Sequence, residues 1–240
     1  MLLLNFPNNP TGYTLQKNEA EELMALIKEA AEKGKRIIVL CDDAYFGLFY
    51  EENIYPESLF AKLSNLHKNV LAIKVDGATK EEFAWGLRVG FITYGNKNLS
   101  SASAKVLEDK TSGSIRSNIS NCSTLSQSLV LAALNEENHQ KDKEEKFNLL
   151  KARYLEVKNV LNDKKYEKYF KALPFNSGYF MCIEVVKEIS AEKVRQILLE
   201  KYDTGVIVSD QLIRIAFSAV AKKDIKQLFE NIYSACEEIL

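Results

Sequence analysis

The stretch "RIIVLCDDAYF" (residues 36–46) decides the fold class of this chain of 240 residues. Its unbroken apolar run is typical of a strand that is buried on both faces of a parallel sheet. A second apolar run, at residues 2–6, precedes it, and residues 15–33 between the two repeat their apolar side chains at helical spacing. A strand, a helix and a buried strand in this order form a βαβ unit, which predicts an α/β fold.

Further elements of the same kind follow along the chain. Two more short strands are predicted at residues 70–80 ("VLAIKVDGATK") and 87–95 ("LRVGFITYG"). Residues 124–134 and 138–161 have the pattern of helices, and the second of these helices is long and highly charged. Together with the βαβ unit, these elements predict a mixed, mostly parallel sheet with flanking helices.

The last third of the chain changes in pattern. Strands are predicted at residues 178–185, 204–210 and 212–218, with a helix at 190–202 and a closing amphipathic helix at 222–240. Strands and helices mixed in this way over a short length are typical of a small α+β domain.

These patterns predict three parts of the chain. A large α/β domain occupies residues 1–137, a long linking helix occupies residues 138–162, and the small C-terminal α+β domain occupies residues 163–240.

Composition excludes several functional classes. Lys and Arg together number 32 against 33 for Asp and Glu, so no charge excess favours nucleic acid or a membrane surface. The four cysteines lie far apart without a C-x-x-C pair, and His67 and His139 are the only histidines, so no metal site is predicted. The three leucines after Met1 are too few for a signal sequence or a membrane span, which leaves the cytoplasm as the expected compartment.

Three motifs carry candidate chemistry. The turn "NNPTG" occupies residues 8–12, "DDAY" occupies residues 42–45 at the end of the decisive strand, and Lys80 precedes Arg88 by eight residues in "KEEFAWGLR". Each has a simpler reading, because a Pro-Gly turn is often only a turn, an Asp can cap a helix, and most lysines are solvated.

In their order and spacing, these motifs resemble the active-site series of the class I/II aminotransferases, the fold-type-I enzymes that use pyridoxal 5′-phosphate (PLP). The resemblance covers most of residues 3–220 and implies a partial PLP-transferase large domain at residues 1–137. A fourth segment, "LIRIAFS", resembles the family segment whose arginine holds the substrate's α-carboxylate, which assigns that role to Arg214; a structural arginine is the alternative.

The resemblance implies a role for each residue that binds the ring of PLP. Lys80 forms the Schiff base with the cofactor aldehyde and then moves the substrate's α-proton. Asp42 pairs with the pyridine nitrogen and keeps it protonated. Tyr45 and Asn9 donate hydrogen bonds to the phenolic oxygen.

Other implied roles concern the phosphate group, where the sequence departs from the family pattern. Arg88 and Thr79 are expected to bind the phosphate. Many family members carry a serine where this chain has Gly77, and Asp43 adds a second acid beside Asp42. Arg116 occupies a position where some relatives reach a neighbouring subunit, although a structural role is the safer reading.

The resemblance is to the C-terminal part of an aminotransferase, because the family's N-terminal segments have no counterpart here. A sheet without its neighbouring strands is expected to expose edges and apolar surface, which favours association and weakens cofactor retention.

The function implied is transfer of an amino group from an L-amino acid to a 2-oxo acid, by a homodimer of a longer parent. This piece need not be active by itself. A PLP-dependent C–S lyase of the same fold and a non-catalytic binding domain are the alternatives.

Overall fold

The protein is described by a computed structural model that covers residues 1–240, and its internal contacts divide the chain into two compact units. Unit 1 comprises Met1–Pro7 and Leu15–Lys143, and unit 2 comprises Asn8–Thr14 and Glu144–Leu240. The division falls within the predicted linking helix. It also assigns the turn at residues 8–14 to unit 2, whereas the sequence prediction places that turn in the large domain.

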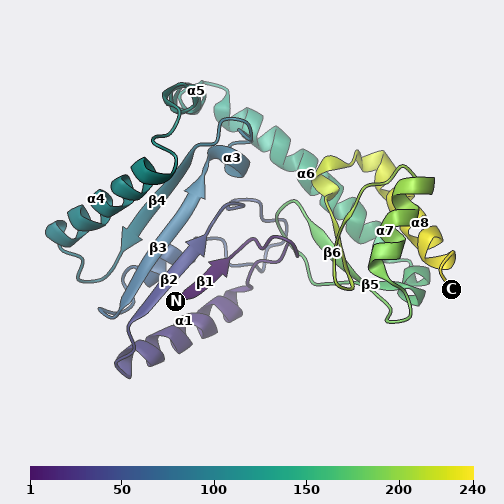
Figure 1. Cartoon of the computed structure of the whole chain (residues 1–240), viewed down its shortest axis with the longest axis horizontal. Helices are drawn as coiled ribbons and strands as arrows, with labels where there is room; N and C mark the ends of the chain where they lie inside the picture. The colour runs from purple at the N-terminus through teal and green to yellow at the C-terminus, as the bar shows by residue number, and fades with distance from the viewer. The chain divides into compact units, whose positions relative to one another are not determined.

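Unit 1 is built on a four-stranded sheet in the order β1-β2-β3-β4 (Figure 1). The strands β1 (Leu2–Asn5), β2 (Ile37–Asp42) and β3 (Val70–Gly77) are parallel, and β4 (Gly90–Gly95) is antiparallel to β3. The predicted α/β class with a mixed, mostly parallel sheet is therefore confirmed.

The core of unit 1 lies on one face of this sheet, under helices α1 (Lys17–Glu32) and α2 (Leu59–Leu63). The apolar face of α1 packs there, because its small and flexible apolar side chains recur at helical spacing. The buried residues of this core include Ala20, Met24, Ile27, Ala31, Val39, Cys41, Leu63, Val70 and Ala72.

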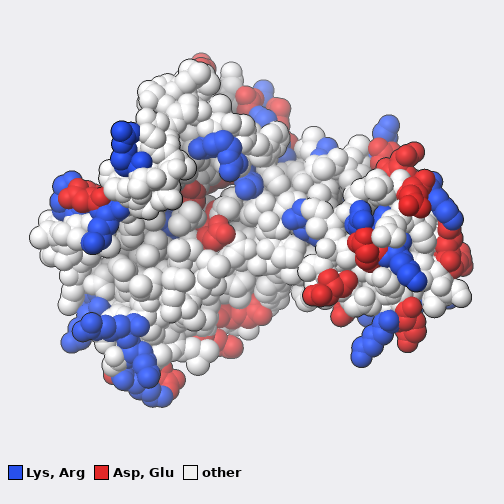
Figure 2. All heavy atoms as spheres, in the orientation of Figure 1, with Lys and Arg blue, Asp and Glu red and all other residues white.

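The opposite face of the sheet is only partly covered, so the prediction of a strand buried on both faces is wrong for β2. Ile38 keeps 41% of its surface exposed, and Leu3 on β1 keeps 63%. Side chains alternate between the two faces of a strand, and α1 and α2 cover only the face of Val39 and Cys41. The exposed apolar surface agrees with the prediction from the sequence, and Figure 2 shows a largely uncharged surface over β1–β4.

Four more helices complete the sequence of elements in this part of the chain: α3 (Ala78–Glu81), α4 (Ser101–Asn118), α5 (Thr124–Leu134) and α6 (His139–Leu161). The predicted helices at 124–134 and 138–161 agree with α5 and α6. Helix α4 was not predicted, and it buries no residue. None of the helices is long and apolar enough to cross a membrane.

Unit 2 contains a second four-stranded sheet, in the order β5-β6-β8-β7, in which every pair is antiparallel. Its strands are β5 (Phe170–Ala172), β6 (Met181–Val185), β7 (Ile207–Ser209) and β8 (Leu212–Ile215). The predicted α+β layer is present, with the added short strand β5.

The helices of unit 2 supply the rest of its core. They are α7 (Ala191–Lys201) and α8 (Ile225–Glu237), with short 3-10 turns at Lys164–Lys168, Phe217–Ala219 and Lys222–Asp224. The stripe of α8 is buried as its amphipathic pattern predicts, with Phe229, Ile232 and Cys236 fully inaccessible to solvent.

The turn at Asn8–Thr14 is fixed within unit 2 by backbone contacts. The carbonyl oxygen of Gly12 accepts bonds from the amides of Asn176 and Ser177, both at 2.9 Å. Gly12 adopts a φ of +70°, and a Cβ at this position would lie 1.9 Å from the carbonyl oxygen of Phe180. Glycine is therefore required at this position by both backbone angle and space.

Candidate active site

The first part of the candidate site lies at the carboxyl ends of the parallel strands of unit 1. Asn5 ends β1 and Asp42 ends β2, and the two residues are paired in register. The side-chain amide of Asn5 donates to Asp42 Oδ2 at 2.9 Å, and the amide of Ala44 donates to Asp42 Oδ1 at 3.2 Å. Because both oxygens accept a hydrogen bond, the Asp42 carboxylate is held in one orientation.

Lys80 lies on α3, directly after β3, and its amine is close to Tyr45. The Nζ atom of Lys80 is 4.8 Å from the centre of the Tyr45 ring, and Tyr45 is buried. A cation over an aromatic face is attracted by the electron-rich ring, so this contact favours the observed position of the Lys80 side chain.

One pocket joins these groups. It has a volume of about 190 Å³ and is lined by Asp42, Thr79, Lys80 and Arg88 together with residues of β3 and β4. Of the seven residues predicted from the sequence to act in catalysis or binding, the structure therefore brings four to one pocket. Tyr45 makes a fifth through its contact with Lys80.

The electrostatic surroundings favour a reactive amine. Burial lowers the pKa of Lys80 below its ordinary value, the Arg88 guanidinium lowers it further, and Asp42 opposes the shift. A lysine with a lowered pKa has a larger neutral fraction near neutral pH, and the neutral amine is the nucleophilic form.

The far end of the pocket has an unusual backbone. Arg88 adopts a φ of +55°, in the left-handed region that side chains other than glycine rarely occupy. Gly77 faces the backbone of β4, and a Cβ there would lie 2.5 Å from the carbonyl oxygen of Val89. The close approach of the two strands therefore excludes the serine that the family pattern carries at this position.

Asp43 is separated from the pocket although it is the neighbour of Asp42. It is 6% exposed, does not line the pocket, and its Oδ2 atom is buried without a hydrogen-bond partner. Burial raises the pKa of Asp43, and a hydrogen bond from Ser58 and the charge of Lys74 act against the shift. Its burial and its hydrogen bond with Ser58 therefore direct this second acid away from the pocket.

A second cluster lies in unit 2 and contains Asn9 and Arg214. The guanidinium of Arg214, on β8, donates from Nη1 to Asn9 Oδ1 at 3.1 Å and lies 4.3 Å from the centre of the Phe180 ring. The Nε atom of Arg214 is buried without a hydrogen-bond partner. A guanidinium that is stacked on a ring and held at one nitrogen retains donors for a planar anion such as a carboxylate.

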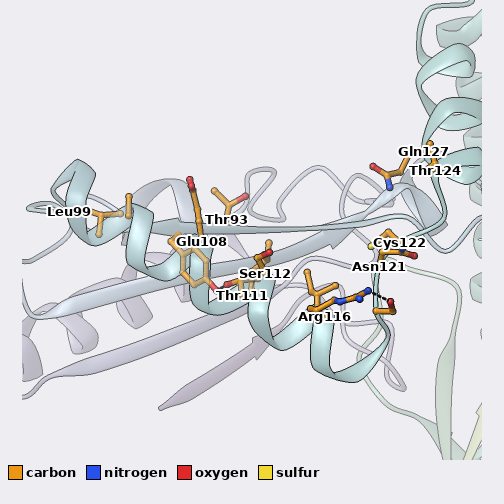
Figure 3. Close-up of a pocket in the computed structure, with 15 residues that line it drawn as sticks. Thr93, Leu99, Glu108, Thr111, Ser112, Arg116, Asn121, Cys122, Thr124 and Gln127 are labelled. Carbon is orange, nitrogen blue, oxygen red and sulfur yellow. Dashed lines mark hydrogen bonds between the residues drawn. The ribbon is translucent and has the colours of Figure 1, made fainter.

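Arg116 belongs to a different hollow of unit 1, shown in Figure 3. Its Nη1 atom donates to Ser120 Oγ at 2.5 Å, near the end of α4. The hollow has a volume of about 840 Å³ and is lined by β4, α4, the segment that follows α4 and the beginning of α5. Within the chain, this arginine therefore makes a local structural contact.

Sequence reasoning missed Asn5, which orients Asp42. The signal was present, because Asn5 is the one polar residue that ends the apolar run of β1 and a parallel partner strand ends in Asp42. The register that places them opposite each other is not readable from local sequence.

The family model described as "Aminotransferase class I and II" matches residues 1–232 of the chain. The chain therefore belongs to this family, as its motifs predicted.

Two curated relatives and one solved structure illustrate the match. The chain is 28% identical over 245 residues to an aspartate aminotransferase of Pyrococcus horikoshii, covering 99% of this chain and 56% of the relative. It is 28% identical over 133 residues to a probable N-acetyl-LL-diaminopimelate aminotransferase of Bacillus subtilis, covering 55% of this chain and 28% of the relative.

The crystal structure of an aminotransferase from Anaerococcus prevotii superposes with a TM-score of 0.81 at 27% identity, covering 98% of this chain and 56% of that chain. The chain thus spans little more than half the length of the aminotransferases that it matches from end to end.

Proposed function

We propose that this chain carries the lysine-bearing part of a PLP-dependent transaminase, which transfers an amino group from an L-amino acid to a 2-oxo acid. The observation that supports this most strongly is the convergence of Lys80, Asp42 and Arg88 on one pocket. The family to which the chain belongs uses PLP, and the lysine, carboxylate and guanidinium are the groups that such a cofactor requires.

The donor set of the pocket fits PLP. Lys80 offers an amine for the aldehyde, Asp42 a fixed carboxylate for the ring nitrogen, and Arg88 and Thr79 a cation and a hydroxyl for the phosphate. When bound, PLP supplies an electron-withdrawing ring that stabilises negative charge on the substrate's Cα. Tyr45, buried beside Lys80, is the residue that we assign to the phenolic oxygen.

Lys80 has two tasks in this proposal. Its amine would hold the cofactor aldehyde, and the neutral amine would also serve as the base that takes a proton from the substrate's Cα and returns one at the end of the amino transfer. Its lowered pKa suits both tasks, because an amine that is protonated at neutral pH can neither bond an aldehyde nor accept a proton.

Asp42 has an electrostatic task. A carboxylate beside a ring nitrogen favours the protonated ring, and the hydrogen bonds from Asn5 and Ala44 keep the Asp42 carboxylate in place. Asn5 is therefore a positioning residue in the proposed site.

Arg214 is the residue that we assign to the substrate's α-carboxylate. Its planar guanidinium matches a carboxylate in a bidentate pair, and Asn9 and Phe180 restrict its orientation. We also propose that Asn9 donates a hydrogen bond to the phenolic oxygen of PLP, as its place in the "NNPTG" motif implies. The identity of the amino acid is left open, and we further propose a cytoplasmic homodimer for the complete enzyme.

The cofactor assignment is tested by mixing the chain with PLP, reducing with borohydride and locating the modified residue by mass spectrometry. We expect the label on Lys80, and its loss in Lys80→Ala. Lys74→Ala is the matched control, because Lys74 lies on β3 and is paired with Asp76 at 2.5 Å instead of lining the pocket. Labelling that spreads over surface lysines and persists in Lys80→Ala would contradict the proposal.

The reaction class is tested by supplying an L-amino acid with and without a 2-oxo acid. Formation of a new amino acid only when the 2-oxo acid is present supports a transaminase. Release of ammonia and pyruvate from a cysteine conjugate, without any 2-oxo acid, would instead identify a C–S lyase.

A further inference from the structure

We propose that Glu82 is a positioning residue for Lys80, because it fixes the short helix α3 to the first two turns of α6 through His139 and Lys143. This inference rests on the proposed function only for the chemical role of Lys80. The mechanical claim concerns residues of unit 1 alone and is testable without any cofactor.

Helix α3 needs external support. It has only four residues, Ala78–Glu81, and a helix of this length has no stability of its own in water. Its end is strained as well, because Phe83 adopts a φ of +54°, where glycine is normally found after a helix. The buried Ala78 packs with Val89 and Val130 and anchors the beginning of α3, so the remaining support must act on its end.

Glu82 supplies that support at the end of α3. Its Oε1 atom lies 2.7 Å from Lys143 Nζ, and its Oε2 atom lies 2.9 Å from His139 Nε2. The Glu82 side chain is 15% exposed and His139 is 23% exposed, so solvent screens this group less than it screens a surface ion pair. The buried Oε2 atom has no conventional hydrogen bond, and the imidazole of His139 is the polar group that lies beside it.

Glu82 is linked to Lys80 through the backbone. The amide of Glu82 donates to the carbonyl oxygen of Ala78 at 3.2 Å, and the amide of Phe83 donates to that of Lys80 at 3.3 Å. A movement of Glu82 away from α6 would open these bonds and carry Lys80 with it. Two consequences follow for the Lys80 amine, namely loss of burial and a greater distance from Arg88.

Both consequences raise the pKa of Lys80, because burial and Arg88 are the two causes that lower it. The direct electrostatic effect of removing Glu82 has the opposite sign, since loss of a negative charge lowers the pKa of a nearby lysine. The sign of the change therefore separates a positioning role from a simple charge effect.

The test is competitive labelling of the chain with acetic anhydride at a series of pH values, with the extent of reaction at Lys80 read by mass spectrometry. In Glu82→Gln we expect the apparent pKa of Lys80 to rise by roughly one pH unit. Glu81→Gln is the matched control: it removes the same charge next to Lys80, and its carboxylate lies farther from Lys143, at 3.6 Å. We expect an unchanged or slightly lower pKa in that variant.

A fall in the pKa of Lys80 in Glu82→Gln, or a change equal to that in Glu81→Gln, would overturn the proposal. Failure of the separate PLP-binding test would remove the chemical role of Lys80 but would leave this result intact, so the two failures are distinguishable.

A second variant keeps the test decisive if Glu82→Gln does not fold. His139→Gln removes the partner and keeps Glu82. Hydrogen exchange at the amides of Glu82 and Ala84, which both donate to the Ala78 carbonyl oxygen, should then become about tenfold faster. Exchange at the wild-type rate would show that α3 is held without this group and would refute the proposal.

Discussion

The two units of this chain differ in how they bury their apolar residues. Unit 2 closes a core around fully buried aromatic side chains, namely Tyr154, Tyr169, Phe170, Phe217 and Phe229. Unit 1 covers one face of its sheet and leaves much apolar surface exposed elsewhere. On α5 the exposed leucines are Leu125, Leu129, Leu131 and Leu134. Figure 2 shows the same contrast on the surface, which is largely uncharged over β1–β4 and densely charged around α7 and α8.

Because of this difference, the closed apolar core and the proposed active-site pocket belong to different units. The pocket with Lys80 lies in the unit that is less completely packed, and its strained backbone at Arg88 must be held by neighbouring residues. Unit 2 buries its large aromatic side chains almost completely. We therefore expect substitutions in the two units to act on different unfolding transitions.

The largest expected effect is in the core of unit 2. Phe229→Ala removes a fully buried ring and should lower the free energy of unfolding of unit 2 by about 3–5 kcal/mol. Far-UV circular dichroism follows both units, whereas the fluorescence of Trp85, the only tryptophan, follows unit 1. In a denaturant titration, the unfolding of unit 2 should move to lower denaturant in the dichroism signal. The transition that is followed by Trp85 fluorescence should stay unchanged.

The contrasting control is Leu131→Ala on α5 of unit 1. Because Leu131 is 62% exposed, its loss should change the free energy of unfolding by no more than about 0.5 kcal/mol. Equal effects of the two substitutions, or a single shared transition, would break the distinction between a closed and an open unit.

Local sequence sufficed for the elements with a strong period. The apolar run before Asp42, the helix before it and the motif from Lys80 to Arg88 predicted the α/β class and the family. Helix α4 escaped prediction because its sequence has no apolar stripe, and no residue of α4 is buried. Strand β5 was also not predicted, because it has only three residues and alternation of apolar and polar side chains cannot be recognised over so short a stretch.

Properties that depend on distant partners could not be predicted. Whether β2 is covered on both faces depends on which helices pack on the sheet, and that is set by the whole chain. The contact between Asn9 and Arg214 joins residues 205 positions apart. The roles of the site residues stay predictions until they are tested chemically, because residue type and spacing constrain a role but do not measure it.

The next largest effect is expected in unit 1, where Gly77 meets the backbone of β4. Gly77→Ser places a side chain within 2.5 Å of the Val89 carbonyl oxygen, so the strands must separate, at a cost of about 1–3 kcal/mol. The tryptophan transition should move to lower denaturant while the unit 2 transition stays. As a control, Gly113→Ser lies in open space on α4 and should be nearly neutral. A stable Gly77→Ser protein that binds PLP more tightly would show that the pocket accepts the family's serine.

A smaller, pH-dependent effect is expected at Asp43. Its pKa in the folded state is raised above the ordinary 3.8, so its contribution to stability is complete below about pH 3.8 and is lost as the pH rises through the folded pKa. The Asp43→Asn variant has no ionisable side chain at this position, so it does not lose stability in this way as the pH rises. Relative to wild type, unit 1 of the variant should therefore gain stability as the pH is raised from acid to neutral.

Denaturation followed by Trp85 fluorescence at several pH values measures this gain. Asp109→Asn is the matched control, because Asp109 pairs with Lys105 on the exposed surface of α4 and has no buried charge to lose. A difference between Asp43→Asn and wild type that is constant with pH would mean that Asp43 is not the group responsible.

The smallest expected effect concerns Arg88 and acts on reactivity more than on stability. The Arg88 guanidinium is the second cause, after burial, of the lowered pKa of Lys80, so Arg88→Met should raise that pKa. Reaction of the Lys80 amine with an aldehyde requires the neutral form. Its rate profile should therefore shift to higher pH by the same amount, while the limiting rate at high pH is unchanged.

Arg116→Met removes an equal charge from the separate hollow of α4 and β4 and should leave the profile in place. If both variants shift the profile equally, the pKa of Lys80 responds to the overall charge of unit 1. That result would contradict the assignment of Arg88 as the specific residue that lowers the pKa of Lys80.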